Sequence, residues 1–444
     1  MGKNNWINKL ITLILFGLIV TLFSLKINSD FNGFFILLLV SIVIIFLGAK
    51  TNNEKLFFVI LFALVLRLIL AIFQVYIGNL PDSTADAVDF ERAGWQIANN
   101  LINFKSTASS LVLLFLKSDG TIRYEILISF LYFLALRAPL ALAGLNLLFN
   151  CLTIFIVYFT ALEIFQNKKI ALTSAIITAI FPTIVLYSVI TLRESLIMCF
   201  FSFSFLMLVK FIKKGNFNFF ILSILSLIGA ILFHTGLVTI LPLYILCLLF
   251  KKTKIPIQKI EKYTIFIILI LIIISIYPFI SQKIFIIKTS LSRLPGTLSK
   301  YVTVASRGRA NYLSNITPKS FFDLIWQTPI RIIYFLFAPF PWQITSKIDL
   351  IAFFDGLLYF ILIISSIFGI KKIWSENTKI GLFSILILLM FLITFGWGVS
   401  NYGTAIRHRS KIAWLLIIIA SPVIYSFFTI INKKLFKNYV HQNS

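Results

Sequence analysis

Long apolar runs recur along almost the whole chain, and they constrain the fold more than any other feature of the sequence. The 444 residues are 59% hydrophobic and 12% charged. Several runs reach the roughly 20 residues that a helix needs to cross a bilayer. Because a bilayer offers backbone groups no water to bind, apolar runs of this length fold as helices. The sequence therefore predicts an all-α polytopic membrane protein.

The spacing of the apolar runs predicts about twelve membrane-spanning helices. Six are expected at residues 8–26, 33–49, 56–77, 138–165, 170–188 and 195–213. Six more are expected at residues 217–233, 236–250, 263–280, 350–370, 380–398 and 411–431. No soluble domain of ordinary size fits between these runs, so we expect one membrane domain over residues 1–444 with both termini on the same side.

The basic residues divide between the two predicted sides of the membrane. Most lysines lie in short loops on the side of the termini, including the pairs Lys168–Lys169, Lys213–Lys214, Lys251–Lys252, Lys371–Lys372 and Lys433–Lys434. Positive loops are typical of the cytoplasmic side, so we expect both termini in the cytoplasm. Of the eleven arginines, ten lie on the opposite side or at its boundary, and Arg67 is the exception. This topology accounts for most of the +25 formal charge without a nucleic-acid partner.

The three cysteines give no sign of a disulfide or a metal site. Cys151, Cys199 and Cys247 all lie inside apolar runs and match no metal-ligand spacing. We expect them to pack as small hydrophobic residues.

Two outward segments are too long to be turns. Residues 79–137 begin with acidic residues and continue with two apolar stretches, Leu111–Leu116 and Ile126–Leu136, that are too short to span. We expect these stretches to be helices lying in or dipping into the outer interface. Residues 281–349 form a basic segment that ends in an apolar stretch, Ile332–Trp342, broken by two prolines. That stretch predicts a re-entrant or interfacial element.

The acidic start of the first segment is the first candidate site. Asp82, Asp86 and Asp89 follow an i, i+4, i+7 spacing, which on a helix would place three carboxylates on one face. Such a cluster can raise the pKa of one carboxyl, hold a divalent cation, or supply a general base for a sugar hydroxyl. A solvated outer loop is the alternative. Asp82 and Asp86 are the best catalytic candidates.

Arg193, Glu194 and His234 form the second candidate group, at the predicted outer ends of spans. Charged residues at a membrane boundary are costly unless they are paired or face a wet cavity. An arginine guanidinium also suits bidentate phosphate contact. The alternatives are a snorkelling arginine paired with a nearby acid, and a histidine with a structural hydrogen bond.

Two basic clusters complete the candidate set. The first cluster, in a predicted outer turn, comprises Arg407, His408 and Arg409. Outer loops normally carry few positive residues, so membrane topology does not explain this cluster, whereas binding of phosphate or pyrophosphate does. His408 is also available there for proton transfer. Arg307 and Arg309 precede the proline-broken aromatic stretch and suit contact with an anionic lipid head and its sugars. The alternatives are an interfacial anchor and contact with phospholipid heads.

These residues resemble two families of membrane enzymes. The first resemblance is to the polytopic GT-C glycosyltransferases, which use polyprenyl-phosphate sugars. It rests on the run Leu66-Arg67-Leu68, the Asp-rich outer loop, the short helices, and Phe181-Pro182 ahead of Arg193-Glu194. The second resemblance is to Wzy-type polymerases of O-antigen and capsule clusters. It rests on the span that begins with Arg193-Glu194, on Phe233-His234, on the large outer loop, and on the stretch from Gly403 to Arg409. Three spans rather than one precede the acidic loop, and no periplasmic domain follows the last span, which is a departure that favours the polymerase.

Each resemblance implies its own site. The GT-C pattern makes Asp82 or Asp86 the base that activates an acceptor hydroxyl. The polymerase pattern rests on arginines that hold pyrophosphate and glycan, namely Arg193, Arg307, Arg309, Arg407 and Arg409. In either case charge develops on a departing phosphate, where arginine is stabilising.

The function predicted first is a repeat-unit polymerase of bacterial surface polysaccharide, acting on undecaprenyl-pyrophosphate-linked glycans at the periplasmic face of the inner membrane. Its expected partners are a lipid-linked donor and acceptor and the bilayer, with a chain-length regulator left open. One alternative is a GT-C enzyme that transfers a single sugar from a polyprenyl phosphate. Another is a flippase for lipid-linked oligosaccharides, which needs a charged path through the spans. Arg67, Asp355, Asn146 and Asn150 lie within predicted spans, and so few residues make a thin path.

Overall fold

The structure is a computed structural model, and it describes residues 31–252, 309–313, 316, 318 and 320–442. It is 84% helical. The described residues contain no strand, only an isolated β-bridge between Asn311 and Asn401. The all-α class predicted from the sequence is confirmed.

The chain divides into two compact units. The first comprises residues 1–156, 175–201 and 229–235, and the second comprises residues 157–174, 202–228 and 236–444. Each unit is described by itself.

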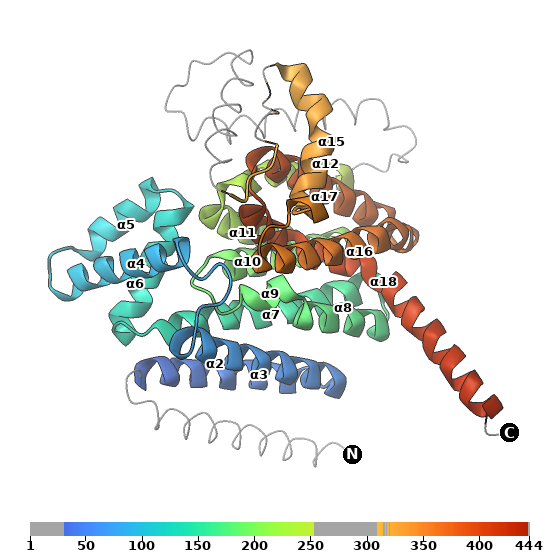
Figure 1. The fold of residues 1–444 in the computed structure, drawn as a ribbon, viewed down its shortest axis with the longest axis horizontal. Helices are drawn as coiled ribbons and strands as arrows, with labels where there is room; N and C mark the ends of the chain where they lie inside the picture. Colours follow the sequence, from blue (N-terminus) through green and yellow to red (C-terminus); the bar gives the residue numbers. More distant parts are fainter. Residues whose placement is uncertain (1–30, 253–308, 314–315, 317, 319, 443–444) are drawn as a thin grey trace. The chain divides into compact units, whose positions relative to one another are not determined.

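Among its described residues, the first unit holds six complete helices: α2 (Phe31–Lys50), α3 (Glu54–Tyr76), α4 (Asp86–Ile102), α5 (Ala108–Lys117), α6 (Gly120–Ala135) and α9 (Pro182–Leu186). It also holds parts of four more: α7 (Pro139–Phe165), α8 (Lys168–Ile180), α10 (Glu194–Lys214) and α11 (Phe217–Phe233). Helix α2 packs against α3, and α4 packs against α6 (Figure 1).

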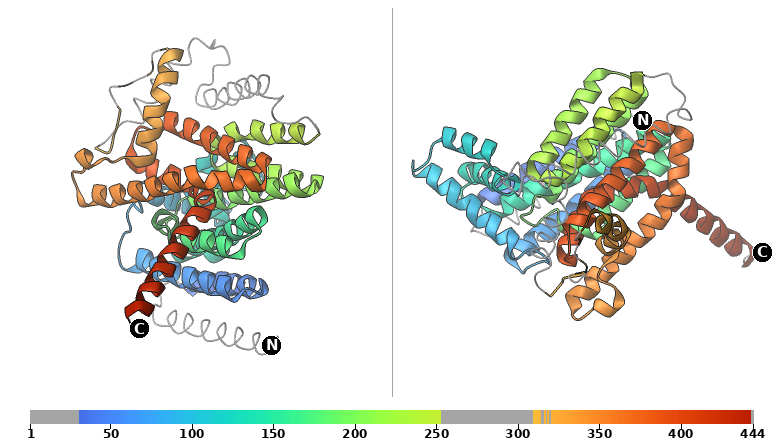
Figure 2. Two further views of the ribbon diagram at one scale, coloured as in Figure 1. Left: turned by 90° about the vertical axis from the view of Figure 1, so that its right-hand side faces the viewer. Right: turned by 90° about the horizontal axis from the view of Figure 1, so that it is seen from above.

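The second unit is built around three long helices, α16 (Lys347–Glu376), α17 (Thr378–Gly398) and α18 (Tyr402–Gln442), which pack against one another (Figure 2). Its shorter elements among the described residues include η1 (Thr235–Ile240), α12 (Leu241–Lys252), α15 (Phe321–Phe337) and η4 (Pro341–Gln343). Helices α16 and α18 meet at Gly369, where an added Cβ would collide with the carbonyl oxygen of Ile419. Small residues permit such close helix contact inside membranes.

Seven described helices are long and apolar enough to cross a membrane, namely α2, α3, α7, α10, α16, α17 and α18. They correspond to seven of the twelve predicted spans, and they confirm a polytopic membrane protein. The predicted spans 8–26 and 263–280 lie outside the described residues. The predicted spans 217–233 and 236–250 are helical but shorter, so the count of twelve is not confirmed.

Local sequence explains where the short helices of residues 79–137 begin. Thr107 and Ser110 form a capping box at the start of α5. Asp119 caps α6, because its side chain accepts hydrogen bonds from the backbone N–H groups of Thr121 at 3.0 Å and Ile122 at 3.2 Å. The two short apolar stretches are thus helices, as predicted. Their position at a membrane interface stays a prediction.

Two local predictions are wrong. Residues 170–188 are not one helix, since α8 ends at Ile180 and α9 begins at Pro182, where a ring without an N–H breaks the hydrogen-bond ladder. Residues 402–409 are not a turn, since they form the first turns of α18. Asn401 starts that helix by accepting the backbone N–H of Gly403 at 2.9 Å.

The proline-broken stretch is also longer than predicted. Helix α15 starts at Phe321 rather than near Ile332, because Ser320 and Asp323 form a capping box there. It ends at Phe337, just before the prolines.

Candidate functional site

The first unit carries an interrupted helix at the place where the sequence puts its Arg-Glu pair. After α9 ends at Leu186, residues 187–193 follow without helical structure until α10 begins at Glu194. Irregular backbone in a membrane protein is tolerated only where its polar groups find partners in the protein or in a wet cavity. Such interruptions are common places for binding sites in membrane proteins.

Polar side chains from neighbouring helices satisfy the carbonyls of this interrupted segment. Asn146 of α7 donates to the carbonyl oxygen of Ile190, and Asn150, one turn later, donates at 2.9 Å to that of Ile184 in α9, just before the segment. Tyr124 of α6 donates its hydroxyl to the carbonyl oxygen of Leu192 at 3.0 Å. Because all three side chains are buried, the segment is held in one conformation rather than solvated.

The acidic loop reaches the same segment. The hydroxyl of Tyr187 donates to the Oδ2 of Asp82 at 3.2 Å. Asp82 is half-buried and lies in the left-handed region with a φ of 62°, which aspartate tolerates better than most residues. Ala85 has a φ of 53°, a conformation that costs free energy for alanine and is found most often near functional sites.

The predicted helical face of three carboxylates is wrong, because α4 begins only at Asp86. Asp86 and Asp89 occupy the first turn of α4 and are exposed, while Asp82 precedes the helix. Asp82 is therefore the carboxylate that the structure attaches to the interrupted segment. Among the described residues, no group of three or more His, Cys, Asp or Glu side chains is placed to hold a metal ion.

Arg193 and Glu194 stand at the junction of the interrupted segment and α10. The half-buried Arg193 donates to Thr121 Oγ1 at 3.4 Å and lies over the ring of Phe90, 5.9 Å from its centroid. Glu194 is 2% exposed and is the first residue of α10, where the positive end of the helix dipole stabilises a carboxylate.

His234 lies beside the start of α6, the same helix end that Arg193 contacts. Arg123 of α6 donates to the carbonyl oxygen of Leu232 at 3.1 Å. Gly120 approaches the carbonyl of Phe233 so closely that an added Cβ would collide with it. The start of α6 thus brings Arg193 and His234 to one region of the first unit.

Glu125, on the next turn of α6, belongs to this region and was missed in the sequence. Burial raises the pKa of its carboxyl, Asp119 raises it further, and Arg193 lowers it. A half-buried carboxyl with a raised pKa beside an arginine is a common feature of functional sites. No spacing in the sequence links Glu125 to Arg193, because their proximity depends on how α6 contacts the residues just before α10.

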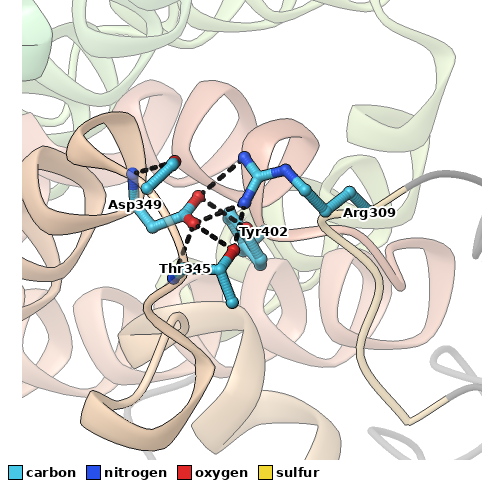
Figure 3. A network of polar contacts seen from close by, with 5 residues as sticks. Arg309, Thr345, Asp349 and Tyr402 are labelled. Atoms are coloured by element: carbon cyan, nitrogen blue, oxygen red, sulfur yellow. Dashed lines mark hydrogen bonds and ion pairs between the residues drawn. The ribbon is translucent and has the colours of Figure 1, made fainter.

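In the second unit, Arg309 pairs with a buried aspartate (Figure 3). Its Nη2 donates to Asp349 Oδ1 at 2.9 Å, its Nη1 also contacts Asp349 Oδ2, and Nη1 donates to Thr345 Oγ1 at 2.7 Å. The hydroxyl of Tyr402 donates to the same carboxylate at 2.7 Å. Arg309 therefore ties the end of the basic segment to α16 and α18. Arg307 lies outside the described residues.

Arg409 is fully buried in α18 and forms an ion pair with Asp355 of α16. It also donates to the carbonyl oxygen of Leu336 at 2.6 Å and lies over the ring of Tyr359, 4.9 Å from its centroid. These contacts give Arg409 the partners of a structural residue. Arg407, two residues earlier, is half-buried.

His408 contacts Lys411, with its Nδ1 2.6 Å from the Nζ of the lysine. The donor in this contact depends on the tautomer of the ring. The contact occupies Nδ1, and the role of His408 as a base stays a prediction.

The predicted site residues thus fall into two groups. Asp82, Arg193, Glu194 and His234 lie in the first unit around the interrupted segment and the start of α6. Arg309, Arg407, His408 and Arg409 lie in the second unit.

Residues 123–278 match the family model of dolichyl-phosphate-mannose-protein mannosyltransferase. On this match the chain is a glycosyltransferase. The matched residues run from α6 through α12 and include Arg193, Glu194 and His234. The match supports a membrane enzyme of the GT-C type. No curated protein matches the chain.

Proposed function

We propose that this glycosyltransferase transfers one sugar from a polyprenyl-phosphate carrier to an acceptor hydroxyl, at the membrane face opposite the lysine-rich loops. The observation that carries the proposal is the hydrogen bond between Tyr187 and Asp82. It joins the acidic loop to the interrupted helix, six residues before Arg193. The carboxylate of Asp82 and the guanidinium of Arg193 therefore lie at the two ends of the fixed segment 187–193.

In this mechanism Asp82 accepts the proton of the acceptor hydroxyl as the oxygen attacks the anomeric carbon of the donor sugar. The bond between that carbon and the phosphate oxygen breaks, and the polyprenyl phosphate leaves with the bonding electrons. Arg193 stabilises the negative charge that develops on the departing phosphate. His234 and Glu194 border the same region and would contact the donor or the acceptor.

The pairings in the second unit favour this reaction over repeat-unit polymerisation. The polymerase hypothesis requires a set of arginines on pyrophosphate and glycan, and two of them, Arg309 and Arg409, pair with Asp349 and Asp355. The Arg409–Asp355 pair is buried, so breaking it to bind a ligand carries a large desolvation cost, whereas Arg309 is 54% exposed in its pair with Asp349. Undecaprenyl-linked substrates, a chain-length regulator, a bacterial inner membrane and cytoplasmic termini remain predictions.

The flippase alternative loses its path for a similar reason. Arg67 and Asn150 bond to each other, Asn146 holds the interrupted segment, and Asp355 pairs with Arg409. Side chains occupied in internal contacts are poorly suited to carry a charged lipid head across the membrane.

Comparing the lipid-linked and surface glycans of a host with and without the gene tests the proposal. We expect the deletion to leave a glycan short by one sugar, and the wild-type gene to restore it. Arrest at one complete repeat unit would instead support the polymerase. Unchanged glycans would contradict both enzymatic readings.

A further inference from the structure

Arg67 is a charged residue in the middle of a membrane-spanning helix, and its side chain is fully buried. Ionisable residues at such positions are expensive and are kept where they serve a function, with partners that offset the cost. The hydrogen-bond partners of Arg67 show which segment of the molecule it holds in place.

Two of these partners belong to the interrupted helix and its neighbour. The Nη1 of Arg67 donates to the carbonyl oxygen of Ala179 at 3.0 Å, within the last turn of α8. Carbonyls in a last turn have no helical donor and carry the negative end of the helix dipole. The Nε of Arg67 donates to Asn150 Oδ1 at 2.8 Å. The guanidinium thus closes the end of α8 and orients the amide of Asn150.

From Asn150 the hydrogen bonds continue to the acidic loop. The Nδ2 of Asn150 donates to the carbonyl of Ile184 at 2.9 Å and to Ser195 Oγ at 3.3 Å. Ser195 Oγ donates to the carbonyl of Tyr187 at 2.7 Å. The hydroxyl of Tyr187 then reaches Asp82. Every side chain in this series except that of Asp82 is at least 99% buried.

We propose that Arg67, Asn150, Ser195 and Tyr187 form a positioning series that holds Asp82 in the orientation needed to accept the acceptor proton. This inference rests on the proposed function, since it assigns these residues a purpose through Asp82. A fixed donor on the carboxylate costs no reorganisation during the reaction. A misplaced base lowers the rate even when every reacting group is present.

Tyr187→Phe tests the last step of the series, because it removes one hydroxyl and leaves the ring. In a deletion host, we expect the variant to form about tenfold to a hundredfold less glycan product per amount of membrane-inserted protein, as for a lost hydrogen bond to a charged group. In an Asp82→Asn background the same substitution should cause no further loss, since the two residues act as a unit. Equal losses in both backgrounds would overturn the series.

Tyr132→Phe is the matched control. Tyr132 is a fully buried tyrosine of the same unit, and its hydroxyl donates to a different carboxylate, that of Glu91, at 2.9 Å. We expect Tyr132→Phe to keep product formation per amount of inserted protein within about twofold of wild type, because its hydroxyl bonds to Glu91 and not to Asp82. A loss as large as that of Tyr187→Phe would mean that any buried tyrosine hydroxyl matters, and would overturn the assignment.

Amide hydrogen exchange of the full chain in detergent tests the series without any substrate. We expect Ser195→Ala and Arg67→Met to accelerate exchange in residues 181–193 and 80–86 by about tenfold or more, while exchange in α17 stays unchanged. Ser195→Ala removes a single oxygen and keeps the test decisive if Arg67→Met fails to fold. Wild-type exchange in Ser195→Ala would overturn the series. If exchange changes but Asp82→Asn still forms product, the series stands as a structural element and the proposed function fails.

Discussion

At the residue scale, an arginine in a membrane sequence can either bind a ligand or stabilise the fold. Only the groups that contact it in the structure separate these two roles. Arg409 and Arg193 look alike in the sequence. In the structure Arg409 is buried against Asp355, whereas Arg193 is half-buried at the end of an interrupted helix. The sequence could nominate both as candidates, but it could not separate them, because Asp355 lies 54 positions from Arg409.

We predict that Arg409→Met destabilises the chain by about 3–5 kcal/mol, because it strands the buried carboxylate of Asp355. The double variant Arg409→Met with Asp355→Leu should recover most of that loss, since it removes both charges together. Thermal unfolding in detergent measures both. If Arg409→Met keeps wild-type stability and only product formation falls, Arg409 binds substrate and its assignment here is wrong.

Glu125 predicts a pH dependence. Because burial raises the pKa of its carboxyl, the folded state holds this proton more tightly than the unfolded chain. Its ionisation therefore lowers stability as pH rises from the ordinary glutamate pKa through the raised one, and the penalty persists above that. We expect Glu125→Gln to unfold at a higher temperature than wild type at pH 7, and at the same temperature near pH 3. An advantage that is largest at low pH would contradict the raised pKa.

At the element scale, hydropathy found long helices and missed interruptions. Seven predicted spans are helices of spanning length, because runs of apolar residues leave few alternatives in a bilayer. The break between α8 and α9 was hidden, since residues 170–188 contain no charged residue and are mostly apolar. The residues that indicate this break are Phe181-Pro182 and the amides of Asn146 and Asn150, which lie one helical turn apart on the neighbouring span. That the two amides bind the carbonyls near the break depends on tertiary packing, which the sequence alone does not give.

The contact of α16 with α18 at Gly369 gives a prediction for helix packing. We expect Gly369→Ala to destabilise the chain by about 1–3 kcal/mol, because the added methyl has no room against the carbonyl of Ile419. Gly144→Ala is the control, because the nearest atom to an added Cβ there lies 3.4 Å away, an ordinary contact. Thermal unfolding of both variants decides the point. Equal stability of the two would mean that α16 and α18 do not approach each other as described.

At the scale of the whole molecule, the division of lysines and arginines predicts which loops share a side of the membrane. We expect a single cysteine placed at Gly215, beside Lys213 and Lys214, to be labelled by a membrane-impermeant thiol reagent only in inverted membranes. A cysteine placed at Asn103, between α4 and α5, should be labelled only in intact cells. The native cysteines are buried and should give little background. Labelling of both positions from the same side would contradict the topology on which the site depends.

Asp82 is the proposed base of this membrane glycosyltransferase, so the most direct measurement is product formation by Asp82→Asn beside Asp89→Asn. Both variants remove one charge from the same acidic segment, but Asp89 is exposed on α4 while Asp82 is bonded to Tyr187. We predict that Asp82→Asn lowers transfer at least a hundredfold, as for loss of a general base, with unchanged amounts of protein in the membrane. Asp89→Asn should stay within about twofold of wild type. Wild-type transfer by Asp82→Asn would contradict the account.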